Sequence, residues 1–175
     1  MSGSRANGVP EVVDAWRMVE ARRSFDGRVA LTALERLLGS LHDGEGEVRF
    51  TLDFGTDVLR LPYVDLRIEA ELPLQCQRSL RRFLLPVRLQ QRLGLIREED
   101  AEAALPPDCE PLLVAADGNL RPLDLVEDEL ILALPVVPVA PDTEAIDRDF
   151  APTAEESARH GSFAALAGWK KEVKE

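Results

Sequence analysis

The chain contains few of the residues on which disulfide, metal and nucleophilic chemistry depend. Its 175 residues include two cysteines, two histidines and three lysines, and 5% are aromatic. Cys76 and Cys109 give no disulfide framework, and a chain of this length buries enough apolar surface to fold without one. The sequence has no secretory leader and no apolar run of about 18 residues. We therefore expect a cytoplasmic protein with no membrane partner.

The sequence also lacks motifs that bind phosphate or a metal ion, and motifs that supply a catalytic base. No P-loop or dinucleotide-binding glycine motif occurs. His42 lies in a polar turn, His160 lies near the C-terminus, and neither has a second histidine at helical spacing. The acidic run at 127–129 does not converge on one ion, because neighbours on a helix diverge by about 100°. We predict no catalytic residue, no metal and no cofactor. A hydrolase that uses Asp and Glu side chains is a further class of function, but no motif in the sequence supports it.

The acidic charge is unevenly distributed along the chain. The net charge is −11, which by itself argues against a nucleic-acid partner. Residues 1–97 carry 15 basic and 13 acidic side chains, whereas residues 98–175 carry 6 and 19. The stretch from Leu72 to Arg97 has no acidic residue and six arginines. A local basic patch is compatible with this distribution, although a solvated strand face is the simpler interpretation.

Apolar periodicity predicts an α+β fold. Helical spacing over 29–41 predicts an amphipathic helix. Alternating patterns predict antiparallel strands over 48–54, 64–76 and 83–95, with Pro73 at an edge or a bulge and Cys76 facing inward. A short acidic helix over 98–105, a strand over 111–115 and a helix from Asp124 to Leu134 follow, the last with an Asp124/Glu127 capping box. We expect a curved antiparallel sheet of five or six strands with two or three packed helices, and barrel-like closure as an alternative.

The C-terminal part differs in composition from the rest. We predict one α+β domain over 1–141, a flexible acidic linker over 142–161, and a short helix over 162–175. Phe163, Leu166 and Trp169 fall on one face of that helix, which makes them candidates for docking on this domain or on a partner.

Two motifs resemble those of the bacterial YceD family of large ribosomal RNA subunit accumulation proteins. One is Cys76-Gln-Arg-Ser79, and the longer one is LVEDELILALPVVP over 125–138, which includes Glu127, Asp128, Glu129 and Pro135. The resemblance covers most of residues 26–171. Ser79 stands where family members have a second cysteine, so a metal site built on that pair is not expected here.

The resemblance implies a non-enzymatic factor in the synthesis, processing or accumulation of 23S rRNA and in large-subunit assembly. With rRNA or a large-subunit precursor as the implied partner, the arginine-rich stretch becomes a candidate RNA surface, because arginine binds phosphate and stacks on unpaired bases. The residues of this hypothesis are Arg78, Arg81, Arg82, Arg88 and Arg92. The alternative is an adaptor that contacts a basic ribosomal protein or an assembly factor without touching RNA.

Overall fold

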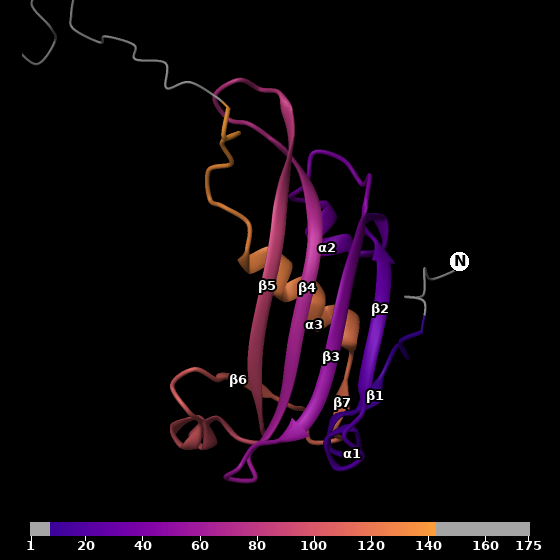
Figure 1. The fold of residues 1–175 in the computed structure, drawn as a ribbon, viewed down its shortest axis with the longest axis vertical. Helices are drawn as coiled ribbons and strands as arrows, with labels where there is room; N and C mark the ends of the chain where they lie inside the picture. The colour runs from indigo at the N-terminus through magenta and orange to yellow at the C-terminus, as the bar shows by residue number, and fades with distance from the viewer. Residues whose placement is uncertain (1–7, 143–175) are drawn as a thin grey trace, which may run out of the picture. The chain divides into compact units, whose positions relative to one another are not determined.

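A five-stranded open sheet is the main layer of the computed structural model, which describes residues 8–142 (Figure 1). Its strand order is β2-β3-β4-β5-β6. The pairs from β2 to β5 are antiparallel, and β6 runs parallel to β5. The strands are β2 (Ser24–Ala30), β3 (Glu47–Thr56), β4 (Pro62–Gln75), β5 (Arg82–Ile96) and β6 (Glu110–Leu113).

Helices and short turns cover one face of this sheet. The longest helix, α3 (Pro122–Leu132), runs across β3, β4 and β5 (Figure 1). A two-stranded ribbon of β1 (Val13–Asp14) and β7 (Asn119–Leu120) lies beside the sheet. The remaining elements are α1 (Ala15–Glu20), α2 (Glu35–Leu38) and the 3-10 turns η1 (Leu31–Ala33) and η2 (Glu99–Ala104). Within residues 8–142, no helix is long and apolar enough to cross a membrane.

The alternating sequence of β3, and of most of β2, β4 and β5, produces one buried and one exposed sheet face. Side chains two residues apart point to the same face, and the strand register places buried residues opposite each other, as at Phe50 and Ile68 or Leu52 and Leu66. Leu125, Val126 and Leu130 of α3 complete the core on the covered side. The predicted strands over 48–54, 64–76 and 83–95 are thus present in β3, β4 and β5.

Gly27 in β2 makes room for an aromatic ring of the core. It lies directly opposite Phe50 of β3, which is 3% exposed. A Cβ atom added at Gly27 would lie 2.4 Å from Cζ of that ring. Glycine at this position therefore allows the Phe50 ring to cover the neighbouring backbone.

The β4–β5 hairpin extends beyond the rest of the sheet. Its pairing continues to Gln75 and Arg82, whereas the last β3 pair on β4 is Val48 with Ala70. Pro73 lies in the extension, where its carbonyl accepts the backbone N–H of His42 at 2.8 Å. Because β3 no longer pairs there, a residue without an N–H is tolerated, and the edge position predicted for Pro73 is correct.

Several sequence predictions are wrong in detail. The sheet is open with edges at β2 and β6, so it is not a barrel, and β6 makes it only mostly antiparallel. The helix predicted over 29–41 is replaced by the end of β2, a 3-10 turn and the four residues of α2, because Val29 pairs with Val48 in the sheet. The short acidic helix predicted over 98–105 is present over Glu99–Ala104, but as a 3-10 helix.

The C-terminal predictions cannot be compared with the fold. The linker predicted over 142–161, apart from Asp142, and the helix predicted over 162–175 lie outside the described residues. The docking residues Phe163, Leu166 and Trp169 lie outside them as well.

Candidate nucleic-acid interface

The five predicted arginines occupy two parts of the β4–β5 hairpin. Arg82, Arg88 and Arg92 belong to β5 and are exposed on the sheet face that the helices leave uncovered, as the alternation predicts. Arg78 and Arg81 lie in the loop that joins β4 to β5 and are also exposed. The arginines therefore lie on one hairpin, but they do not share one environment.

Two of these arginines are bound by carboxylates. Arg92 donates from Nε and Nη2 to the two oxygens of Asp65, both at 2.7 Å, and its guanidinium lies 4.2 Å from the centre of the Tyr63 ring. Arg82 reaches across the hairpin to Asp43 at 2.6 Å and to Glu45 at 3.1 Å. Their donors are directed at protein carboxylates, so Arg82 and Arg92 are poor candidates for phosphate binding.

The Arg82–Asp43 pair predicts a measurable titration shift. The Arg82 guanidinium, followed by the Glu45 backbone N–H, lowers the pKa of Asp43 from 3.8 to about 2. A folded pKa below the unfolded one stabilises the fold above pH 4, and this contribution is lost as the pH falls through 2. In an NMR titration we expect the Asp43 midpoint near 2, and Arg82→Gln to move it toward 3.8. Arg88→Gln is the control; an unmoved midpoint in Arg82→Gln would contradict the pairing.

The exposed sheet face carries balanced charge. The residues on this face of β2 to β5 are six arginines and six carboxylates: Arg28, Arg49, Arg67, Arg82, Arg88, Arg92, Asp26, Glu47, Asp53, Asp65, Glu69 and Glu71. Four of these arginines form ion pairs with strand carboxylates, for example Arg49 with Glu47 at 3.3 Å and Arg67 with Asp53 at 3.8 Å. The face therefore does not produce the positive field that attracts a phosphate backbone.

Arg28, Arg49 and Arg67 were not among the sequence candidates. They line an open depression on this face, together with residues such as Thr51 and Glu69. The alternation of β2, β3 and β4 was sufficient to place them on the exposed face. They were missed because the candidates were taken from the acid-free stretch of sequence over 72–97. The arginines and carboxylates that lie beside β5 in the sheet come from earlier strands, outside that stretch.

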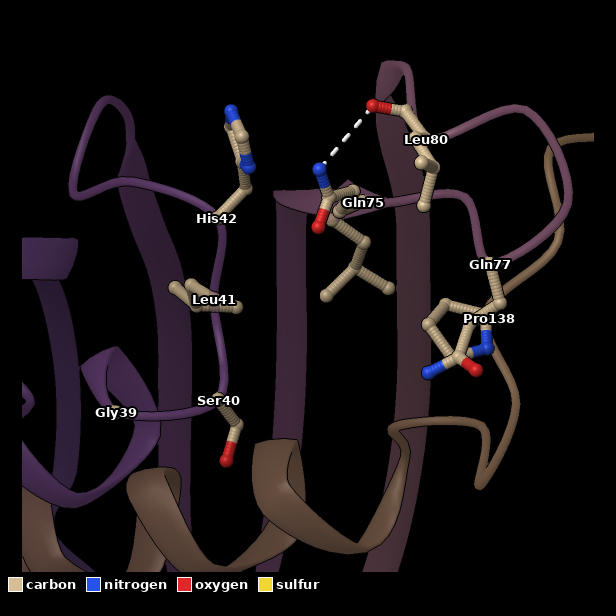
Figure 2. Close-up of a pocket in the computed structure, with 9 residues that line it drawn as sticks. Gly39, Ser40, Leu41, His42, Gln75, Gln77, Leu80 and Pro138 are labelled. Carbon is tan, nitrogen blue, oxygen red and sulfur yellow. Dashed lines mark hydrogen bonds between the residues drawn. The ribbon is translucent and has the colours of Figure 1, made fainter.

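The hairpin loop has a different environment. Among residues 8–142, three of the predicted arginines, Arg78, Arg81 and Arg88, have no ion-pair partner. Arg88 lies on the charge-balanced sheet face, whereas Arg78 and Arg81 lie in the loop. The loop borders an open hollow of about 500 Å³, which Figure 2 shows between the loop, residues 39–42 and Pro138. Gln77 and Leu80 line this hollow, and each directly precedes one of the two arginines. Arg92 lines two smaller pockets beside β5, but its guanidinium is bound by Asp65. Of the predicted set, Arg78 and Arg81 are therefore the two arginines without an ion pair that adjoin a hollow.

Cys76 holds the base of this loop. Its side chain is fully buried, as predicted, and its sulfur accepts the Ser79 backbone N–H at 3.5 Å. Its own N–H donates to the Arg81 carbonyl at 2.9 Å. In residues 8–142, no three His, Cys, Asp or Glu side chains are placed to hold a metal ion. The structure gives Cys76 a packing and loop-shaping position.

Glu127, at the centre of the longer motif, joins two helices. It is 6% exposed, and its Oε1 accepts the backbone N–H groups of Arg36 at 2.7 Å and Leu37 at 3.0 Å. Its Oε2 accepts from Arg36 Nε at 2.9 Å. The N-cap residue of α2, Leu34, offers no side-chain acceptor, so Glu127 of α3 supplies the missing cap and meets the positive end of the helix.

The predicted Asp124/Glu127 capping box is therefore wrong. Helix α3 begins earlier, at Pro122, and its N-cap residue Arg121 makes no side-chain cap. Asp124 instead pairs with Arg121 at 3.1 Å. Proline suits the first turn because that turn needs no N–H, and it moves the helix start away from the predicted residue.

The other motif residues lie around Glu127. Asp128 is exposed and pairs with Arg36, which thus bridges two consecutive carboxylates of α3. Glu129 is partly buried, and this burial, followed by the nearby Glu110 and Asp128 charges, raises its pKa. Pro135 follows the end of the helix at Leu132.

Residues 8–142 thus form an α+β protein with an open sheet, an ion-paired outer face and a polar hollow at one end of the sheet. The sequence profile of the family described as "Large ribosomal RNA subunit accumulation protein YceD" matches residues 64–170, more than half of the chain. The chain belongs to the YceD family, which confirms the resemblance noted in the two motifs.

A relative supports the same assignment over a longer span. The Large ribosomal RNA subunit accumulation protein YceD of Haemophilus influenzae is 29% identical over 167 residues, which cover 93% of this chain and 96% of the relative. No solved structure matches the chain.

Proposed function

We propose that the chain is a non-enzymatic cytoplasmic factor in the accumulation of 23S rRNA, and that it acts by binding rRNA or a large-subunit precursor at the β4–β5 loop. The family name and the relative's name both refer to large-subunit rRNA. The observation that carries the RNA-binding part is the position of Arg78 and Arg81, which are exposed, unpaired within residues 8–142, and adjacent to a hollow.

The charge of the domain limits what this surface does. Residues 8–142 contain 15 arginines, no lysine and 25 acidic residues, a net charge of −10. Such a domain repels a uniform phosphate backbone, so binding has to come from local contacts. Arginine suits this role, because its planar guanidinium binds a phosphate bidentately and also stacks on bases. We therefore expect weak non-specific binding and a small number of phosphate contacts.

The double charge reversal Arg78→Glu with Arg81→Glu tests the proposal. If each arginine contacts one phosphate, the reversal should weaken binding to a large-subunit rRNA fragment by about tenfold or more. For single-stranded segments, the slope of log affinity against log salt should become shallower by about 1.4. Both quantities are measured by filter binding across a salt series.

A matched control separates local contacts from total charge. Arg17→Glu with Arg23→Glu makes the same charge change at the α1 end of the sheet, far from the hairpin loop (Figure 1). We expect this variant to retain the wild-type slope. Equal slopes for the wild type and the hairpin variant would refute RNA binding at this loop.

The second candidate function is a protein adaptor, and the net charge of −10 favours it. An acidic domain attracts a basic ribosomal protein or assembly factor, and residues 163–171 would supply the docking helix. A pulldown with and without the last 15 residues, before and after RNase treatment, distinguishes the two functions. Partners that survive RNase and depend on these residues support the adaptor; loss of every partner with RNase supports RNA binding.

A further inference from the structure

The hollow beside the hairpin loop is built from three separate parts of the chain. The segment 39–42 after α2 forms one side, the end of β4 and the hairpin loop form another, and Pro138 closes the third (Figure 2). Apolar walls come from Leu41, Leu74, Leu80 and Pro138, and polar groups from Ser40, His42, Gln75 and Gln77. Its volume of about 500 Å³ lies within the range of small-ligand sites.

No carboxylate lines this hollow, although the domain has 25 acidic residues. A site for a cation or for a basic side chain would need such acceptors. The lining instead combines apolar surface with uncharged amide and hydroxyl groups and one imidazole. That combination suits a flat, largely apolar ligand with hydrogen-bonding edges, which is the chemistry of a nucleobase.

Two main-chain hydrogen bonds and one side-chain hydrogen bond hold the shape of the loop. The Leu80 N–H donates to the Cys76 carbonyl at 2.8 Å, and the Gln77 N–H donates to the Pro138 carbonyl at 2.9 Å. The Gln75 amide donates to the Leu80 carbonyl at 3.1 Å, as the dashed line in Figure 2 shows. Leu80 adopts a left-handed conformation, with φ of 58°, and the residue is 69% exposed. The loop therefore presents Leu80 at the rim in a fixed geometry.

Three polar side chains of the hollow remain available for a ligand. Within the described part of the chain, Ser40, His42 and Gln77 form no side-chain hydrogen bond. The Gln77 amide by itself offers two hydrogen-bond donors and an acceptor oxygen, which match the mixed donors and acceptors on the edge of a base. Arg78 follows it directly in the chain and is exposed, which suits a phosphate attached to a base in the hollow.

We propose that this hollow binds one unpaired RNA base, with the adjoining phosphates on Arg78 and Arg81. This inference rests on the proposed RNA-binding function and makes it specific for single-stranded rRNA. A paired base keeps its hydrogen-bonding edge inside the duplex and cannot enter, whereas a base from a loop or bulge can be turned out of its stack.

Fluorescence anisotropy on the full chain tests the inference. The probe is a labelled RNA of about 12 nucleotides, used alone and annealed to its complement. We expect the single strand to bind at least about tenfold more tightly than the duplex. Gln77→Met, which keeps the side-chain length and removes the amide, should weaken single-strand binding about fivefold without changing the salt slope. Ser40→Leu, which fills the hollow, should weaken it at least as much.

The control is Gln90→Met on the exposed face of β5, which should bind like the wild type. If Gln77→Met and Ser40→Leu bind like the wild type while the Arg78/Arg81 reversal fails to bind, the base site is overturned and the RNA surface stands. Duplex bound as tightly as single strand by the wild-type chain also overturns the base site, and this comparison needs no variant to fold. Absence of binding to either RNA overturns both proposals.

Discussion

Replacing Glu127 with alanine should lower the free energy of unfolding by about 3 kcal/mol. The carboxylate accepts two backbone N–H groups at the start of α2 and the Nε of Arg36, and it is nearly fully buried. Alanine leaves both N–H groups without an acceptor in a place that water reaches poorly. Urea unfolding followed by circular dichroism measures the change.

Two further variants assign this loss to the cap. Asp128→Ala removes the exposed carboxylate that binds the same Arg36 and should cost no more than about 0.5 kcal/mol. Glu127→Gln keeps an oxygen for the two N–H groups and removes the charge, so its effect should lie between those of the two alanine variants. A Glu127→Ala loss as small as that of Asp128→Ala would show that the cap contributes little.

Replacing Gly27 with alanine should destabilise the fold by about 2 kcal/mol. The new methyl carbon would lie 2.4 Å from Cζ of Phe50, and that ring is packed in the core, where displacing it disturbs other contacts. Phe50→Leu, which shortens the side chain, should relieve the clash. In a double-mutant cycle, the cost of Gly27→Ala should be mostly lost in the Phe50→Leu background.

Gly39→Ala provides the glycine control. A Cβ at Gly39 makes only ordinary contact, at 3.6 Å from the Arg36 carbonyl, and the φ of −62° suits any residue. That variant should be neutral or slightly stabilising, because alanine restricts the unfolded chain. Additive effects of Gly27→Ala and Phe50→Leu would contradict the proposed contact between the two positions.

The long strands of the fold could be predicted from the sequence, and the helices less so. In β3, β4 and β5 the apolar period of two coincides with the buried face for many residues, so local pattern and tertiary structure agree. Leu31, Leu34 and Leu37 also fit a helical period, yet they are buried from a 3-10 turn and a four-residue helix. The spacing of apolar residues does not distinguish one long α-helix from a 3-10 turn followed by a short helix, because both arrangements place these leucines toward the same core.

The partners of the charged residues could not be predicted. Glu127 and Arg36 are 91 positions apart, and no local pattern relates them. The arginine-rich stretch has no acidic residue in sequence, but Asp43 and Asp65 reach Arg82 and Arg92 from the segments before it. Which arginines remain unpaired depends on strand register, and register depends on the whole sheet. The RNA-facing role of the remaining arginines stays a prediction.

The overhanging end of the β4–β5 hairpin carries the candidate binding loop beyond the last pair of the β3–β4 ladder. Beyond Ala70, β4 has no strand-to-strand ladder with β3, and Arg82 crosses to Asp43 and Glu45 where that ladder is missing. Leu72, Leu74 and Cys76 of the extension are nevertheless buried, so the extension is anchored by packing and not by a third strand. Sequence changes at the exposed tip of the loop, residues 77–81, should therefore cost little stability, whereas changes at the buried positions beneath it should destabilise the domain.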